Sequence, residues 1–326
     1  MNAEGANPHQ RLDAQHESAT LLRRMAVAED GEWGMSKESN KDSKLKTALR
    51  PQMLTSKSEG QFNSRDWIKE GNHLFASSKA TRAVWVVKRR KLKRSLNAMG
   101  NWTHGTGMWA DLEGLPKASM LLLGYSVEMF LKAGLAKAYQ GCSEQMFDRD
   151  VRQFSHDFKK LAKEVAFDSS ERDRMDLGIL QKMVLFNARY PIKPRESITA
   201  IRQQAERMHQ VWSKAEFTRM RQMVLRIRAH VSRIDMDSFN PSSVASIKLD
   251  DDGYVTYRTG GHLPPRVTFK YSTSQRHAGE DNVDALRNLA RDGQLLLLDH
   301  IWEQATFHED NLPAERQSLA GSSETS

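Results

Sequence analysis

The chain contains almost no cysteine, since Cys142 is the single one among its 326 residues. One thiol excludes an intramolecular disulfide and any metal site built from several thiolates, and it fits a reducing compartment. The opening residues MNAEGANPHQ lack the basic start and the apolar core of a secretory signal. We therefore expect a cytoplasmic protein that uses no metal and no other cofactor.

Apolar residues are also scarce, at 39% of the chain, which is low for a protein of this length that folds throughout. Residues 1–62 are rich in polar and charged side chains and cannot bury enough apolar surface to offset the entropy of ordering. We predict a disordered polar tail there and a second one over residues 311–326. Between them, we expect a helical domain over residues 63–236 and an α+β extension over residues 237–310.

Carboxylates are absent from one long stretch, Gly71 to Ala110, in a chain of net charge +8 and pI near 9.5. Within it, Trp85 and Trp102 flank a dense basic run that consists of Lys88, Arg89, Arg90, Lys91, Lys93 and Arg94. Such a run can grip a phosphate backbone, and a neighbouring aromatic ring can stack on a base. Alternatively, it is the solvated end of a helix, where the helix dipole favours cations. The sequence leaves both interpretations open.

The segment from Met120 to Tyr139 is apolar on nearly every face, which predicts a central helix packed on several sides. Small residues at Gly124 and Gly134 would let neighbouring helices approach closely. Glu128 and Lys132 lie one turn apart in this segment, and a membrane span would have to bury both charges. We therefore expect no membrane association.

Other helices are predicted from caps and apolar spacing. Ser64 is a candidate N-cap for a long first helix, and Ser155 for a short one. Residues 97–117, with four glycines and a proline, predict a connector loop. A helix over residues 170–187 should bury the stripe formed by Met175, Ile179, Met183 and Phe186. Helical spacing also covers residues 197–234, as one bent helix or as two helices that meet near residues 214–217.

Beyond residue 237 the apolar period changes to alternation. Residues 246–258 alternate around an Asp-Gly turn at Asp252 and Gly253, and residues 266–272 alternate again, which predicts a small antiparallel meander. The acidic turn lacks the spacing of an EF-hand calcium loop. A last helix is predicted over residues 282–307, interrupted at Gly293.

Four short motifs follow one another in a recognisable order: RDW opening the first helix, GYSVEMFLKAGL in the central helix, then SHDF, then ARYP at a helix end. This series, over roughly residues 64–234, resembles the HEPN family (higher eukaryotes and prokaryotes nucleotide-binding), in its RYP-containing branch. The resemblance implies an antiparallel helical bundle, here with a small C-terminal β-meander and a terminal helix. It also implies dimerisation and a link to RNA cleavage, RNA binding or nucleotide binding in stress, defence or toxin-antitoxin systems.

Nuclease members of that family use an arginine and a histidine, with four to six residues between them, in a metal-free ribonuclease site. The equivalent arginine would be Arg189, but no histidine follows it at that spacing. Arg202 and His209 fit the spacing instead, and a basic helix can also produce such a pair by chance. Glu128 could support a site of this kind. It either forms a local ion pair with Lys132 or meets a cation from another helix, for which Arg189 is the first candidate.

Three hypotheses follow for the function. The first is an RNA- or nucleotide-binding protein of the HEPN type with weak or no catalysis, which binds through Arg189 and the basic run. The second is a metal-independent endoribonuclease that uses Arg202, His209 and Glu128, with histidine as the acid or base and arginine stabilising phosphorane charge. The third is a homodimeric interaction module whose C-terminal extension contacts a protein partner.

Overall fold

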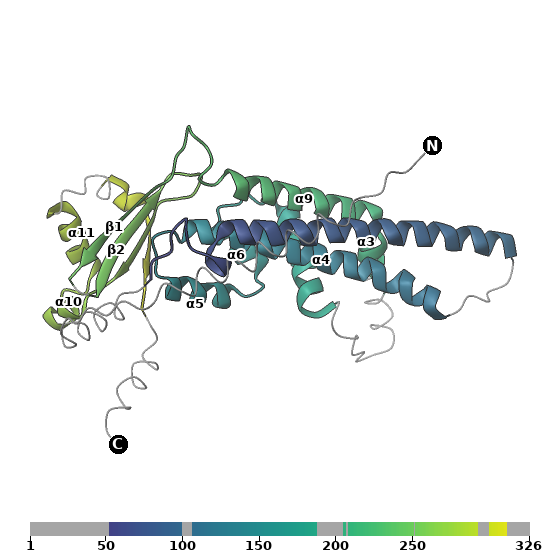
Figure 1. Ribbon diagram of the computed structural model, residues 1–326, viewed down its shortest axis with the longest axis horizontal. Coiled ribbons are helices and arrows are strands. Elements are labelled where there is room, and N and C mark those ends of the chain that lie inside the picture. The colour runs from purple at the N-terminus through teal and green to yellow at the C-terminus, as the bar shows by residue number, and fades with distance from the viewer. Residues whose placement is uncertain are drawn as a thin grey trace, which may run out of the picture. The chain divides into compact units, whose positions relative to one another are not determined.

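The protein is mostly helical and carries one small sheet, as the computed structural model in Figure 1 shows. The structure describes residues 52–99, 106–187, 205–206, 208–250, 252–292 and 300–311. Arg189, Arg202, Trp102 and the tails over residues 1–51 and 312–326 lie outside the described residues. The mainly α prediction with a small C-terminal β part is confirmed at this level.

The two longest helices pack against each other along much of their length. Helix α3 spans Ser64–Met99, and α4 spans Thr106–Ala138 (Figure 1). The cap of α3 is Asn63, whose Oδ1 accepts from the backbone N–H of Arg65 at 2.9 Å, so the predicted cap at Ser64 is one residue late. The predicted long first helix is present.

Helix α4 contains the predicted central helix, and its apolar side chains are buried on all sides. The core around it includes Leu123, Val127, Phe130, Leu131 and Leu135, all with no exposed surface. Among the described residues, one stretch, Ala110–Ala138, is long and apolar enough to cross a membrane, and 67% of its most apolar window is buried inside the protein. Burial of that extent is what the central helix of a bundle requires.

The predicted connector over residues 97–117 is wrong at both ends, because α3 runs to Met99 and α4 begins at Thr106. Helix α4 therefore contains Pro116, which has no N–H to donate to the carbonyl of Leu112 one turn earlier. That carbonyl accepts instead from the indole N–H of Trp85 on α3, at 3.1 Å. Packing from another helix thus overrides the local signal for a loop.

Two glycines of α4 allow the close helix contacts that were predicted from their size. A Cβ at Gly124 would lie 2.8 Å from Val184, and a Cβ at Gly134 would lie 2.8 Å from Val165 and 3.2 Å from Val231. Both distances are too short for a methyl group without movement of the neighbouring helix.

We expect Gly134→Ala to destabilise the protein by about 1–3 kcal/mol through overpacking. Gly114→Ala is the matched control, because it lies in the same helix with no atom within 4 Å of its Cβ position. The control should stabilise by roughly 0.5–1 kcal/mol, since alanine is the better helix former. Urea denaturation of both variants measures the difference, and equal effects would show that α4 is not tightly packed at Gly134.

Shorter helices complete the bundle. Helix α5 was not predicted, α6 and α7 were, and α7 continues into one turn of π-helix, η2. Their bounds are Glu144–Phe154 for α5, Phe158–Glu164 for α6, Glu171–Lys182 for α7, Met183–Asn187 for η2 and Lys214–Arg233 for α9. Ser213 caps α9 by accepting from Glu216 N at 3.2 Å, so the segment predicted over residues 197–234 breaks at Ser213.

Two details of these helices differ from the predictions. Asp157, not Ser155, caps α6, because its side chain accepts from Lys160 N, whereas Ser155 ends α5 with a φ of 48°. On α7, Met175 is 51% exposed, and the buried face carries Asp176, Leu177 and Leu180. Because the buried face of α7 includes the carboxylates of Asp173 and Asp176, it is not the purely apolar stripe that was predicted.

Residues 52–62 correct the predicted extent of the N-terminal tail. Leu54 is 1% exposed in the bundle core, and its backbone exchanges hydrogen bonds with Gly141 and Cys142. A 3-10 turn, η1, spans Gly60–Phe62 directly before α3. One buried leucine and these backbone bonds are enough to hold a segment whose composition is polar.

The sheet has four strands in the order β1-β2-β3-β4, with bounds Ser243–Leu249, Gly253–Thr259, Arg266–Lys270 and Thr306–Glu309. The first three strands are antiparallel neighbours, and Leu249 pairs with Gly253 at the predicted hairpin, so the meander is confirmed. β4 pairs with β3 in parallel, which was not predicted.

The predicted last helix over residues 282–307 is wrong at its C-terminal end, and the interruption predicted at Gly293 lies outside the described residues. Helix α10 spans Thr273–Ala278, α11 spans Val283–Asp292 and a 3-10 turn, η3, spans Trp302–Gln304, before the chain enters β4. Phe307 lies opposite Val267 of β3, and its ring lies 4.7 Å from that of Trp302. These contacts belong to a second, smaller core under the sheet, and they explain why the chain is extended there.

Candidate nucleic-acid interface

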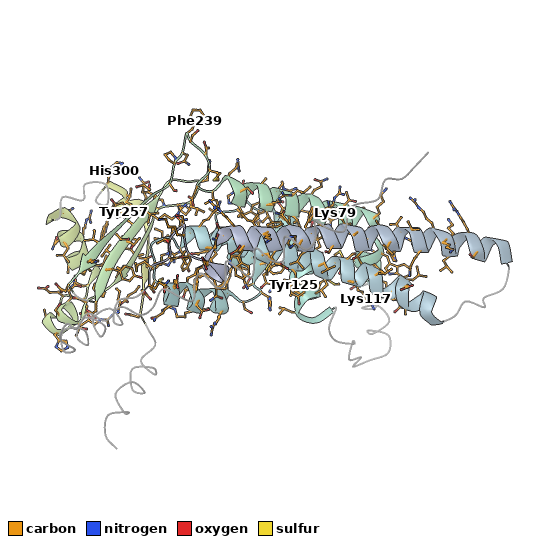
Figure 2. The ribbon with its side chains drawn as sticks, viewed as in Figure 1. Lys79, Lys117, Tyr125, Phe239, Tyr257 and His300 are labelled. Carbon is orange, nitrogen blue, oxygen red and sulfur yellow. The ribbon has the colours of Figure 1, made fainter. Side chains whose placement is uncertain are left out.

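A groove runs between α3 and α9 and is lined by basic side chains. It consists of two adjoining hollows of about 690 Å³ and 510 Å³, which share Lys79 and Arg221. Figure 2 shows the side chains of both helices and labels Lys79 on α3. We call this surface the α3–α9 groove, and its cationic lining residues are Lys79, Arg82, Arg89, Arg90, Lys93, Lys214, Arg221 and Arg228. Among the residues that the structure describes, no carboxylate lines it.

Helical spacing places these cations along the groove. On α3, Lys79, Arg82, Arg90 and Lys93 recur at intervals of three, eight and three residues, which keeps them on one face. Lys214, Arg221 and Arg228 recur every seven residues on α9. Lys79 and Lys214 were missed in the sequence because they lie outside the dense basic run, although the seven-residue spacing of the α9 cations was visible.

Arg82 has a structural role within the groove wall. Its guanidinium donates to the backbone carbonyls of Val211, Trp212 and Ser213, the last two at 3.1 and 3.0 Å. These carbonyls end the helical segment before α9, where backbone acceptors need partners. Burial, together with neighbouring Arg89, lowers the pKa of Arg82 to about 10, which leaves it charged at neutral pH.

Trp85 does not offer the stacking surface that was suggested for it. It is 2% exposed, and its indole N–H donates to the carbonyl of Leu112. The guanidinium of Arg82 covers its ring at 4.2 Å. Arg89 lies over the same ring at 5.2 Å and over Trp212 at 5.7 Å. The aromatic pair therefore packs against two arginines of the groove, and Trp85 is not available to stack on a base.

The residues of the predicted basic run differ in their contacts. Lys88 forms an ion pair with Asp111 of α4. Arg89, Arg90 and Lys93 line the groove. Lys91 and Arg94 are exposed and do not belong to its lining.

The arginines of α9 divide in the same way. Arg219 donates to both oxygens of buried Asp176 on α7, at 2.8 and 2.9 Å, and Arg226 pairs with Asp173 of the same helix. These two hold α9 against α7. Arg221 and Arg228 face the groove, and Nε of Arg221 is buried without a hydrogen-bond partner among the described residues. Such a donor is costly unless a ligand or water meets it.

The predicted catalytic residues do not converge within the described chain. Glu128 is 2% exposed, and its carboxylate contacts Lys132 Nζ at 2.8 Å and His156 Nδ1 at 2.9 Å. His209 is exposed and is not among these contacts, while Arg202 and Arg189 lie outside the described residues. The second partner of Glu128 is thus His156, from the turn between α5 and α6, and both partners satisfy a buried charge.

No protein-family model matches the chain, and neither does any curated protein or solved structure. The resemblance to the HEPN family therefore stays a prediction from four motifs.

Proposed function

We propose that this protein binds RNA through the α3–α9 groove. The observation that supports it is the lining of this groove, where several cations face one surface and no carboxylate of the described residues neutralises them. Phosphate groups are the ligands that such a surface attracts, because the attraction is long-ranged and needs no base contacts. The motif resemblance to HEPN proteins favours RNA among the polyanions.

The length of the groove favours a polynucleotide over a single nucleotide. Lys79 and Lys93 lie fourteen residues apart on α3, which corresponds to about 21 Å at 1.5 Å per residue. Arg228 extends the basic lining further, through the second hollow. A mononucleotide cannot contact cations that are so widely separated, whereas a strand with several phosphates can.

Binding without cleavage fits the described residues better than nuclease activity. Among these residues, no histidine lines the groove. Glu128 is held by its two partners in the bundle core. A general acid or base must reach the reacting oxygens, and Glu128 and His209, the two proposed catalytic residues that the structure describes, do not line the groove.

The proposal predicts a steep salt dependence. Six cations, Lys79, Arg90, Lys93, Lys214, Arg221 and Arg228, can contact phosphates, so log K should fall against log salt with a slope of roughly −4 for single-stranded RNA. Fluorescence anisotropy of labelled RNA at several salt concentrations measures this slope. Arg90→Ala should reduce its magnitude by about 0.7, and Arg94→Ala, outside the groove, should leave it unchanged. Binding that is absent, or independent of salt, would contradict the proposal.

A further inference from the structure

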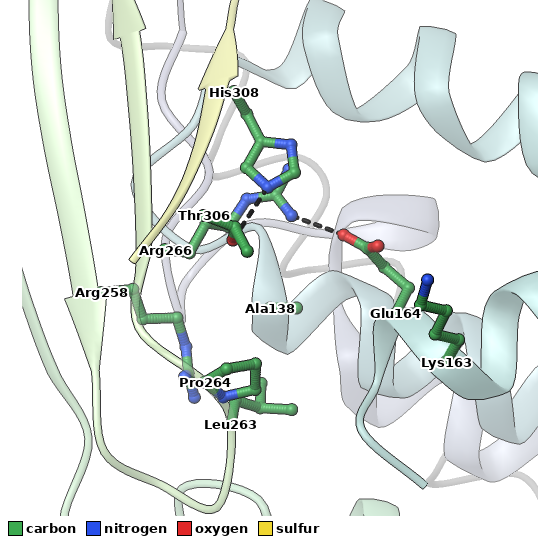
Figure 3. Close-up of a pocket in the computed structure, with 9 residues that line it drawn as sticks. All are labelled: Ala138, Lys163, Glu164, Arg258, Leu263, Pro264, Arg266, Thr306 and His308. Atoms are coloured by element: carbon green, nitrogen blue, oxygen red, sulfur yellow. Dashed lines mark hydrogen bonds and ion pairs between the residues drawn. The ribbon is translucent and has the colours of Figure 1, made fainter. Parts of the chain in front are cut away.

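A second cavity lies where the sheet meets the end of α4 and helix α6, and Figure 3 shows its lining. The sheet residues lie on one side, with Lys163 and Glu164 of α6 facing them. The volume is about 200 Å³. We call it the sheet cavity, and its lining residues are Ala138, Lys163, Glu164, Arg258, Leu263, Pro264, Arg266, Thr306 and His308.

Two buried arginines stand directly opposite each other on this face of the sheet. Arg258 of β2 and Arg266 of β3 are cross-strand partners, with 1% and 6% of their surface exposed. Like charges at such positions repel each other, and burial strengthens the repulsion. Arg258 is fully occupied, since it donates to the carbonyls of Lys137 and Gly260, each at 3.1 Å, and pairs with Asp235.

Arg266 is only partly occupied. Its Nη1 donates to Glu164 at 2.6 Å, and the guanidinium lies 3.8 Å from the centre of the Tyr139 ring. Its Nη2 is buried and has no hydrogen-bond partner among the described residues. Arg266 is therefore paired with one carboxylate, that of Glu164, and still has a donor without a partner among the described residues. The second buried arginine, Arg258, lies beside it.

The rest of the lining adds donors and no further carboxylate. Thr306 of β4 is the register partner of Arg266. Its hydroxyl donates weakly to the carbonyl of Pro265, at 3.5 Å, and its Oγ1 lies 3.1 Å from Nε2 of His308. Lys163 adds a third permanent positive charge at the α6 side. Burial, together with nearby Arg266, lowers the pKa of His308 to about 4, so the imidazole is neutral at pH 7 and can donate one hydrogen bond. The described lining thus carries three permanent cations and one carboxylate.

We propose that the sheet cavity binds a single phosphate-sized oxyanion through Arg266, Lys163 and Thr306. A guanidinium N–H, an ammonium group and a hydroxyl are donors that proteins use for this chemistry. The cavity is smaller than the about 300–1,000 Å³ of pockets that hold drug-sized ligands, so it fits the anion and not a whole nucleotide. Bound there, the anion would accept from the unpaired Nη2 of Arg266 and from Lys163, and would tie the sheet to α6. This inference is independent of RNA binding in the α3–α9 groove.

Thermal unfolding of the full chain in inorganic phosphate, against chloride at equal ionic strength, tests the site. A ligand that binds the folded state raises the unfolding midpoint with its concentration. Lys163→Glu should weaken phosphate binding at least tenfold. Lys160→Glu is the matched control, because this exposed lysine lies on the same helix outside the cavity and should leave binding unchanged.

The imidazole NMR signals of His308 locate the bound anion. Phosphate should shift them in the wild type and in the Lys160→Glu variant, and not in Lys163→Glu. A nucleoside monophosphate that binds more tightly than phosphate would assign the oxyanion to a nucleotide whose base stays outside the cavity, and equal or weaker binding would assign it to the free ion. An unfolding midpoint that phosphate does not raise would overturn the proposal. A midpoint that phosphate raises equally in the wild type and in Lys163→Glu, while the His308 signals do not shift, would overturn it as well.

Discussion

Charge reversal at Arg90, Lys93 and Lys214 is expected to lower RNA affinity about 1,000-fold. All three side chains are exposed in the α3–α9 groove, on both of its walls. A hydrogen bond to a charged group contributes about 1.5–3 kcal/mol, and three lost at the lower value amount to about three powers of ten. The added carboxylates repel phosphate as well. Glutamate at residue 214 also suits the first turn of α9, where negative charge is favoured, so the variant should fold.

The matched control reverses the same number of charges on exposed residues outside the groove: Lys69→Glu, Lys91→Glu and Arg94→Glu on α3. Its net charge equals that of the groove variant, so any effect of overall charge on RNA binding is common to both. Anisotropy titrations at one fixed salt concentration compare them, with circular dichroism to check folding. If both variants lose affinity equally, the α3–α9 groove is not the binding surface.

Part of this interface could be predicted from the sequence. The carboxylate-free stretch and the basic run at residues 88–94 both point to α3. Which cations remain available could not be predicted, because their partners are distant in sequence. Lys88 forms an ion pair with Asp111, 23 residues away, and Arg82 donates hydrogen bonds to carbonyls about 130 residues away. Counting charges locates a basic surface, whereas the packing of other helices decides which charges face solvent.

The fold shows the same division between local and distant causes. The central helix and the hairpin at Gly253 depend on neighbouring residues, and the sequence signals both. The continuation of α4 through Pro116 depends on Trp85, and the strand at Phe307 depends on β3, about 40 residues earlier. In both places the local pattern favours a different structure, and tertiary contacts outweigh it.

Replacement of Glu128 by alanine is expected to destabilise the protein by about 3–5 kcal/mol, which is typical when one partner of a buried ion pair is removed. The carboxylate lies in the bundle core between Lys132 and His156, whose side chains are 13% and 29% exposed. Without it, the ammonium group of Lys132 loses its ion-pair partner in a place with little access to water. Urea denaturation gives the change in the free energy of unfolding, and the slope of the transition checks that two-state unfolding is retained.

Glu70→Ala supplies the matched control, since Glu70 pairs with His73 at 3.6 Å on α3 with both side chains more than half exposed. An exposed pair of this kind contributes about 0–1 kcal/mol, so the control should lose little. The comparison also separates the two roles considered for Glu128. A structural tie predicts a large loss of stability in Glu128→Ala with RNA affinity unchanged in the folded fraction. A small loss of stability, combined with the loss of an RNA-cleaving activity present in the wild type, would instead favour the ribonuclease hypothesis, in which Glu128 supports Arg202 and His209.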